Sequence, residues 1–97
     1  MIIVHEIFVA KPGNASKLAK MFKEATKESP EVKHILTDVT GAYNRVVMVS
    51  QYENLSAYEK NWERMKEKPE VMKKMEEGMK GYQDMYLTGS REIFQVW

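Results

Sequence analysis

Glu6 is the side chain in this sequence that is best suited to acid–base chemistry. It stands in an apolar run and alternates with Val4 and Phe8, so these side chains share one face of an extended strand. A carboxylate on such a face has to be protonated, hydrogen-bonded or paired with a cation. We therefore predict that Glu6 acts as a general base or a ligand anchor. The alternative is a side chain that reaches the solvent-exposed rim, or one that forms a structural ion pair with Arg45 or Arg91.

His5 lies on the opposite face of the same run and is a second candidate, together with Arg45, for base or ligand chemistry. A lone histidine among aliphatic residues is also typical of a hydrogen-bonded interior position. His34 is the only other histidine, and the chain has no cysteine and no His-x-x-x-His spacing. Four methionines, from Met65 to Met79, recur at helical spacing, which packing explains better than Cu(I) binding. We expect no metal and no cofactor.

A second group of side chains offers stacking surfaces and hydrogen-bonding groups for a planar organic ligand. Packing within the core and a hairpin is the alternative explanation for the same residues. The candidate ligand-binding residues are Phe8, Asn44, Tyr52, Tyr58 and Trp62.

Composition excludes several classes of function. Fifteen basic and fourteen acidic residues in a chain of 97 leave a net charge of +1, which disfavours nucleic-acid binding. No apolar run is long enough for a membrane span and no leader sequence is apparent, so we expect a cytoplasmic protein. No Gly-rich phosphate loop, nucleotide fingerprint or Ser-His-Asp motif occurs.

The elements that must position these residues follow from hydrophobic periodicity. Period-two patterns predict strands, while spacings of three and four residues predict helices. Pro69 cannot lie inside a helix, so the long helical segment after Asn54 should divide near Lys68. The expected elements are a strand over Ile2–Ala10, a helix over 14–28, a hairpin with arms 32–40 and 43–52, the divided helical segment, and a last strand over 85–97 interrupted at Gly89-Ser90.

This order predicts one α+β domain over residues 1–97, a ferredoxin-like β-α-β-β-α-β fold with a four-stranded antiparallel sheet. The first and third strands, Ile2–Ala10 and 43–52, are apolar on both faces and should be central. The helices can cover only one face of the sheet. A second copy would cover the other, which predicts a homodimer.

Four stretches of the sequence resemble the NIPSNAP-like branch of the dimeric α/β-barrel superfamily. The resemblance implies a dimeric α/β barrel and transfers no catalytic residue set. Where that branch commonly carries an arginine, two residues before an aromatic in the first strand, this chain has Glu6. The stretches are Phe8-Val9-Ala10-Lys11-Pro12-Gly13, Gly41-x-x-Asn44-x-Val46-Val47, Tyr52-x-x-Leu55-x-x-Tyr58-Glu59 and Lys68-Pro69-Glu70.

Several functions are compatible with this fold, and the fold alone does not choose among them. The first is the binding of a small apolar or aromatic metabolite between the sheet and the helices. The second, implied by the superfamily, is a cofactor-independent monooxygenase in which Glu6 deprotonates a phenolic substrate. Haem binding is disfavoured because haem-holding relatives use a histidine of the second helix, and residues 55–79 contain none. An amino-acid-sensing regulator would normally carry a helix-turn-helix segment, which this chain lacks.

Overall fold

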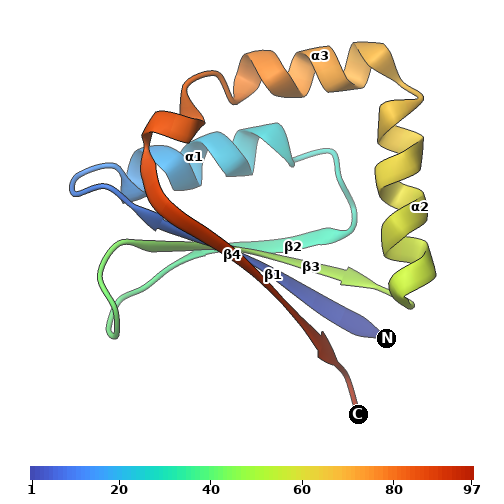
Figure 1. Ribbon diagram of the computed structural model, residues 1–97, viewed down its shortest axis with the longest axis horizontal. Coiled ribbons are helices and arrows are strands. Elements are labelled where there is room, and N and C mark those ends of the chain that lie inside the picture. The colour runs from blue at the N-terminus through green and yellow to red at the C-terminus, as the bar shows by residue number, and fades with distance from the viewer.

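A four-stranded antiparallel sheet is the framework of the protein, which a computed structural model describes over residues 1–97 (Figure 1). The strands lie in the order β2-β3-β1-β4, so the first and third strands are central as predicted. Both central strands are rich in β-branched residues, which suits strands that are paired on both edges. Their bounds are β1 (Ile2–Ala10), β2 (Val32–Thr37), β3 (Arg45–Tyr52) and β4 (Tyr86–Gln95).

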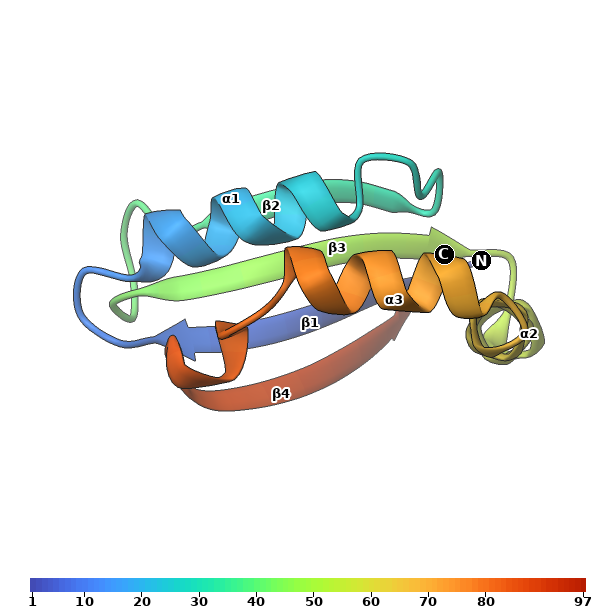
Figure 2. The ribbon, with the colours of Figure 1, turned by 90° about the horizontal axis from the view of Figure 1, so that it is seen from above.

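All helices lie on one face of the sheet (Figures 1 and 2). The helix α1 (Ala15–Ala25) runs along the sheet, α2 (Leu55–Lys66) rises from the end of β3, and α3 (Pro69–Gly78) returns above the sheet. A short 3-10 helix, η1 (Tyr82–Asp84), leads into β4. Pro69 begins α3, which confirms the predicted division near Lys68. The fold is the predicted ferredoxin-like α+β fold, and none of its helices combines the length and apolarity that crossing a membrane requires.

The buried core lies between α1 and the end of the sheet next to it. Leu18 and Phe22 of α1 are fully buried against Ala10 and Val46, and a second buried site, Val4, continues along β1. Neither α2 nor α3 contains a fully buried residue. These two helices therefore enclose space above the sheet instead of packing tightly on it.

The predicted helix over 14–28 ends three residues early, at Ala25. Both the backbone N–H and the hydroxyl of Thr26 donate to the carbonyl oxygen of Phe22, at 3.0 and 2.7 Å. This double contact satisfies the end of the helix before Ser29-Pro30 is reached. At the other end Asn14 is the N-cap residue, but its side chain makes no capping hydrogen bond.

Two predicted features of the sheet were wrong. The last strand is continuous through Gly89 and Ser90, because both residues pair in register with β1, opposite Phe8 and Ile7. The hairpin arms are shorter than expected, since residues 38–44 form a loop in which Gly41 and Asn44 have positive φ angles of 108° and 62°. Such angles are incompatible with a regular strand.

Candidate functional site

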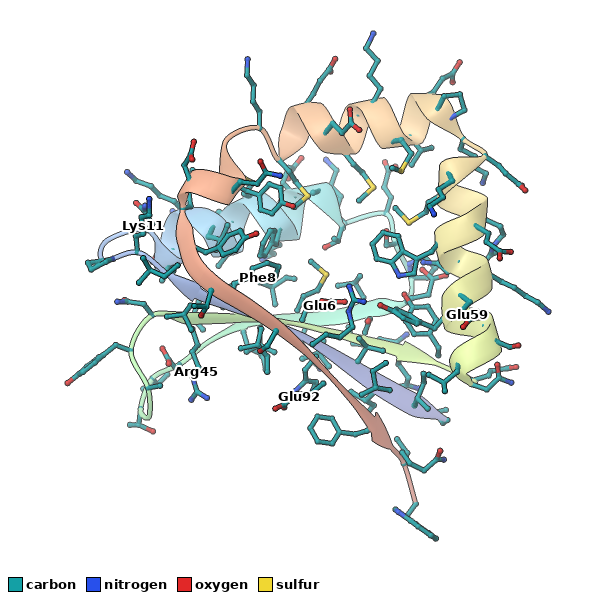
Figure 3. All side chains as sticks on the ribbon, in the orientation of Figure 1. Glu6, Phe8, Lys11, Arg45, Glu59 and Glu92 are labelled. Carbon is teal, nitrogen blue, oxygen red and sulfur yellow. The ribbon has the colours of Figure 1, made fainter.

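A cavity of about 520 Å³ lies between the helix-covered face of the sheet and α1, α2 and α3. It is the space between sheet and helices in which a ligand was expected. Figure 3 shows Glu6 and Phe8 projecting from β1 toward the helices, while Arg45 and Glu92 lie on the other side of the sheet. Five of the predicted site residues line this cavity: Glu6, Phe8, Tyr52, Tyr58 and Trp62.

Glu6 is held in the cavity by an ion pair across the sheet. Glu6 of β1 and Arg91 of β4 are directly opposite in the register, so both side chains project from the same face. Arg91 Nε donates to Glu6 Oε1 at 2.6 Å, and the Tyr58 hydroxyl donates to the same oxygen at 3.4 Å. Of the two partners proposed for Glu6, Arg91 is therefore the one found, and Arg45 is not.

Arg91 joins the ion pair to the aromatic wall of the cavity. Its guanidinium carbon lies 5.8 Å from the centre of the Tyr58 ring, within the range of a cation–π contact. The hydrogen bond to Glu6 raises the pKa of Arg91 above its usual value. The Glu6 side chain is 18% exposed and that of Arg91 49%, so the carboxylate is the more enclosed member and the guanidinium reaches the open part of the site.

The aromatic wall is a row of three rings that α2 aligns with the end of β3. The Tyr52 and Tyr58 rings meet edge to face at 5.1 Å, and Tyr58 meets Trp62 at 6.4 Å. Asn54 fixes the start of α2, because its side-chain oxygen accepts the Ala57 N–H at 2.9 Å. Burial raises the pKa of Tyr52, whose hydroxyl oxygen also accepts from the Asn61 side chain at 3.4 Å.

Methionines form the rest of the apolar wall and were not predicted as site residues. Their helical spacing indicated a packing stripe, and that stripe faces the cavity because α3 stands away from the sheet. Unbranched thioether side chains adapt to ligands of different shape and contact aromatic rings favourably. The lining methionines are Met48, Met65, Met72, Met75 and Met79.

A groove between the end of α1 and the junction of α2 and α3 adjoins the cavity. The groove carries charges of both signs, among them Lys27, Arg64 and Glu70. Residues that line both spaces are Ser29, Glu31, Asn61, Met65 and Met75.

The remaining predicted site residues do not line this cavity. His5 lies on the uncovered face of the sheet, where its ring meets that of Phe94 at 5.1 Å. Arg45 pairs with Asp38 at 3.1 Å and closes the loop between β2 and β3. Asn44 lies in the same loop, and its carbonyl oxygen accepts the Ala10 N–H at 2.7 Å. These residues are engaged in structural contacts outside the cavity.

No three His, Cys, Asp or Glu side chains converge as a metal site would require. The polar groups facing the cavity are suited to hydrogen bonding and to the exchange of a proton at Glu6. Together with the aromatic and thioether walls, they give the cavity an apolar lining with a few polar groups.

The fold is shared with several solved structures. A NIPSNAP family protein from Agrobacterium tumefaciens superimposes with a TM-score of 0.77 at 11% identity, over 97% of this chain and 90% of that one. An uncharacterized NIPSNAP domain protein from Burkholderia xenovorans gives 0.76 at 15% identity, over 100% and 95% of the two chains. A putative antibiotic biosynthesis monooxygenase from Nitrosomonas europaea gives 0.66 at 14% identity, over 99% and 98%.

At these identities the solved structures establish the fold and leave the chemistry open. No curated protein gives a significant match to the sequence. The sequence model of the NIPSNAP family, in contrast, matches residues 6–88, which include the second half of β1, all of β2 and β3, and all the helices. The chain belongs to the NIPSNAP family.

Proposed function

We propose that the protein binds a small apolar or aromatic metabolite in the cavity between the sheet and the helices. The observation that carries this proposal is the cavity itself, whose volume of about 520 Å³ falls within the range of small-molecule sites. Twelve of its 23 lining residues are hydrophobic, and Arg91 and Tyr58 both donate to Glu6 on the sheet side of the cavity. Such a composition favours an apolar body with one polar anchor.

Native mass spectrometry of freshly purified protein tests this proposal. We expect a bound small molecule that survives desalting, and we expect Met75→Glu to lose it, because a carboxylate would enter the apolar wall. Lys73→Glu is the control, since Lys73 is exposed on the same helix and does not line the cavity. Retention of the same molecule by the folded Met75→Glu variant would place binding elsewhere.

A second candidate function is a cofactor-independent monooxygenase. Solved structures described as putative antibiotic biosynthesis monooxygenases share the fold, and Glu6 Oε2 accepts no hydrogen bond within the chain. In this reaction Glu6 takes the phenolic proton and the phenolate supplies the electrons to O₂. One oxygen atom becomes a quinone carbonyl and the other leaves as water. The ion pair with Arg91 favours the binding function, because it already engages Glu6 as a structural anchor.

Oxygen consumption with electron-rich phenols and hydroquinones separates the two functions. A monooxygenase would consume oxygen above the blank, and Glu6→Gln would lower the rate by about 10² or more. A binding protein would consume none and would retain the same ligand in parallel mass spectra. We expect the second result.

The proposed assembly is a homodimer that covers the free face of the sheet. Ile3, Ile7, Val47 and Val49 of the central strands project from that face, and no helix lies over it. Phe94 adds an apolar ring that is 47% exposed. A second copy supplies the same apolar surface and would bury on the order of 1,200–2,000 Å² in total.

Sedimentation at micromolar concentration checks this assembly. We expect a dimer for the unmodified chain and a monomer for Val47→Lys, because a charge would lie at the centre of the interface. Thr37→Lys is the control, since Thr37 is exposed on an edge strand and its register partner Val46 faces the helices. A monomeric unmodified chain would overturn the proposed dimer without affecting the cavity.

A further inference from the structure

The Glu6–Arg91 pair offers both a hydrogen-bond donor and a hydrogen-bond acceptor to one polar head group of a ligand. Arg91 uses only Nε on Glu6, and its two terminal amino groups make no hydrogen bond within the chain. Glu6 uses only Oε1, which accepts from both Arg91 and Tyr58. Free donors and a free acceptor therefore stand side by side at the sheet floor of the cavity.

We propose that this pair selects a neutral head group that carries an acceptor beside a donor, such as a primary carboxamide, on an apolar aromatic body. The inference rests on the proposed binding function and adds its ligand class. The head-group oxygen accepts from an Arg91 terminal amino group, and its N–H donates to Glu6 Oε2. Both free groups of the ion pair are then satisfied at once.

Charge balance argues against a charged head. The carboxylate and the guanidinium cancel each other, so an anion that gains from Arg91 is repelled by Glu6, and a cation faces the reverse. A charged head would also lose water on entering the apolar cavity without gaining an unbalanced partner. The other charged lining residues, Glu31, Glu76 and Lys80, carry a net charge of −1, which adds to the repulsion of an anionic head.

The walls define the body of the ligand. Phe8 and Trp62 offer ring surfaces, and the methionines accommodate an aromatic body without fixing its outline. The walls therefore select broadly for apolar aromatic character. Discrimination between related ligands is left to the head group, where an analogue that covers Glu6 and Arg91 without pairing their free groups binds less tightly.

A matched probe series tests the head-group preference by calorimetry. The probes are naphthalene-2-carboxamide, naphthalene-2-carboxylate, naphthalen-2-ylmethylammonium and 2-methylnaphthalene. We expect the carboxamide to bind at least about tenfold more tightly than either charged probe and about fivefold more tightly than the headless one. Equal affinities for all four would overturn the head-group inference while supporting the apolar cavity, and binding of none would overturn both proposals.

Variants that remove one charge of the pair should change which probe binds best, a result that loss of structure would not produce. Glu6→Gln leaves the guanidinium unbalanced, so we expect the preference to move to the carboxylate, and Arg91→Gln should move it to the ammonium. The double variant restores neutrality and should again discriminate against both charged probes. Glu59→Gln, on α2 outside the cavity lining, is the control and should change nothing. Unchanged preferences in both single variants would show that the pair does not contact the head group.

Discussion

The Phe8 ring of β1 lies 4.9 Å from the Phe22 ring of α1, and Phe8 also lines the cavity between the sheet and the helices. Phe22 is fully buried and Phe8 is half-buried. The pair therefore forms a boundary at which the packed core on one side gives way to open space on the other. Gly89 of β4 is the register partner of Phe8, and a Cβ added there would lie 3.5 Å from the Phe8 ring, at ordinary van der Waals distance.

Removing the Phe22 ring should destabilise the whole fold. Phe22→Ala is expected to lower the free energy of unfolding by about 3–5 kcal/mol, through lost burial and the cavity left behind. Urea midpoints with unchanged slopes measure the effect. Lys20→Ala, at an exposed position of α1, should change the free energy by less than about 0.5 kcal/mol. Equal effects at the two positions would mean that α1 presents a different face to the sheet.

The fold was predictable because its signals are local and repeated. The alternation in β1 and β3 and the helical spacing after Asn54 identify the elements. Pro69 marks the division between α2 and α3, because proline is tolerated only in the first turn of a helix. The end of α1 was less predictable. It depends on one hydroxyl contact, from Thr26 to the Phe22 carbonyl, which no periodic pattern records.

The site was predictable in its parts and not in its pairing. Glu6 and Tyr58 follow from residue type and from the face of each element, since both patterns are periodic. Choosing Arg91 over Arg45 as the partner of Glu6 requires the register between β1 and β4, which is a long-range property. The helical methionines were predicted to pack in the core. The amphipathic spacing of α3 is the same whether the helix packs on the sheet or lies at a distance from it, so the sequence does not reveal the cavity.

The two asparagine N-caps should differ in their contribution to stability. Asn54 accepts the Ala57 N–H through its side chain, whereas the Asn14 side chain makes no capping bond. Asn54→Ala is therefore expected to cost about 1 kcal/mol of unfolding free energy, and Asn14→Ala less than about 0.5 kcal/mol. Chemical denaturation of both variants measures the difference. A larger loss at Asn14 would contradict the capping geometry at the start of α1.

Alanine substitutions at two glycines should change the stability of the protein in opposite directions. Gly41 has a φ of 108° and an added Cβ would lie 2.8 Å from Arg45 Nη2, so Gly41→Ala should destabilise the protein by about 1–2 kcal/mol. Gly78 ends α3 with open space around it, so Gly78→Ala should stabilise by about 0.5 kcal/mol. Thermal unfolding of both variants shows whether each substitution stabilises or destabilises the protein. A stabilising Gly41→Ala would mean that the loop between β2 and β3 does not hold this conformation.

Tyr52 should be among the last tyrosines to ionise as the pH rises. Burial is the main cause that raises the pKa of its phenol in the folded protein, while an exposed phenol ionises near pH 10. Ultraviolet titration of tyrosinate should therefore show a late component in the unmodified chain that Tyr52→Phe removes. Tyr43→Phe is the control, because Tyr43 is 88% exposed and its loss should leave the late component in place.

The same shift fixes the pH window in which Tyr52 affects stability. A pKa raised in the folded state means that the native protein holds the phenolic proton more tightly than the unfolded chain. The contribution is therefore fully present below about pH 10 and is lost as the pH rises through the folded-state pKa. Urea unfolding of the unmodified chain and Tyr52→Phe should give a constant difference in free energy up to about pH 9, and above it the difference should shift against the unmodified chain. A difference that stays constant through pH 11 would contradict the burial of this phenol against Tyr58 and Asn61.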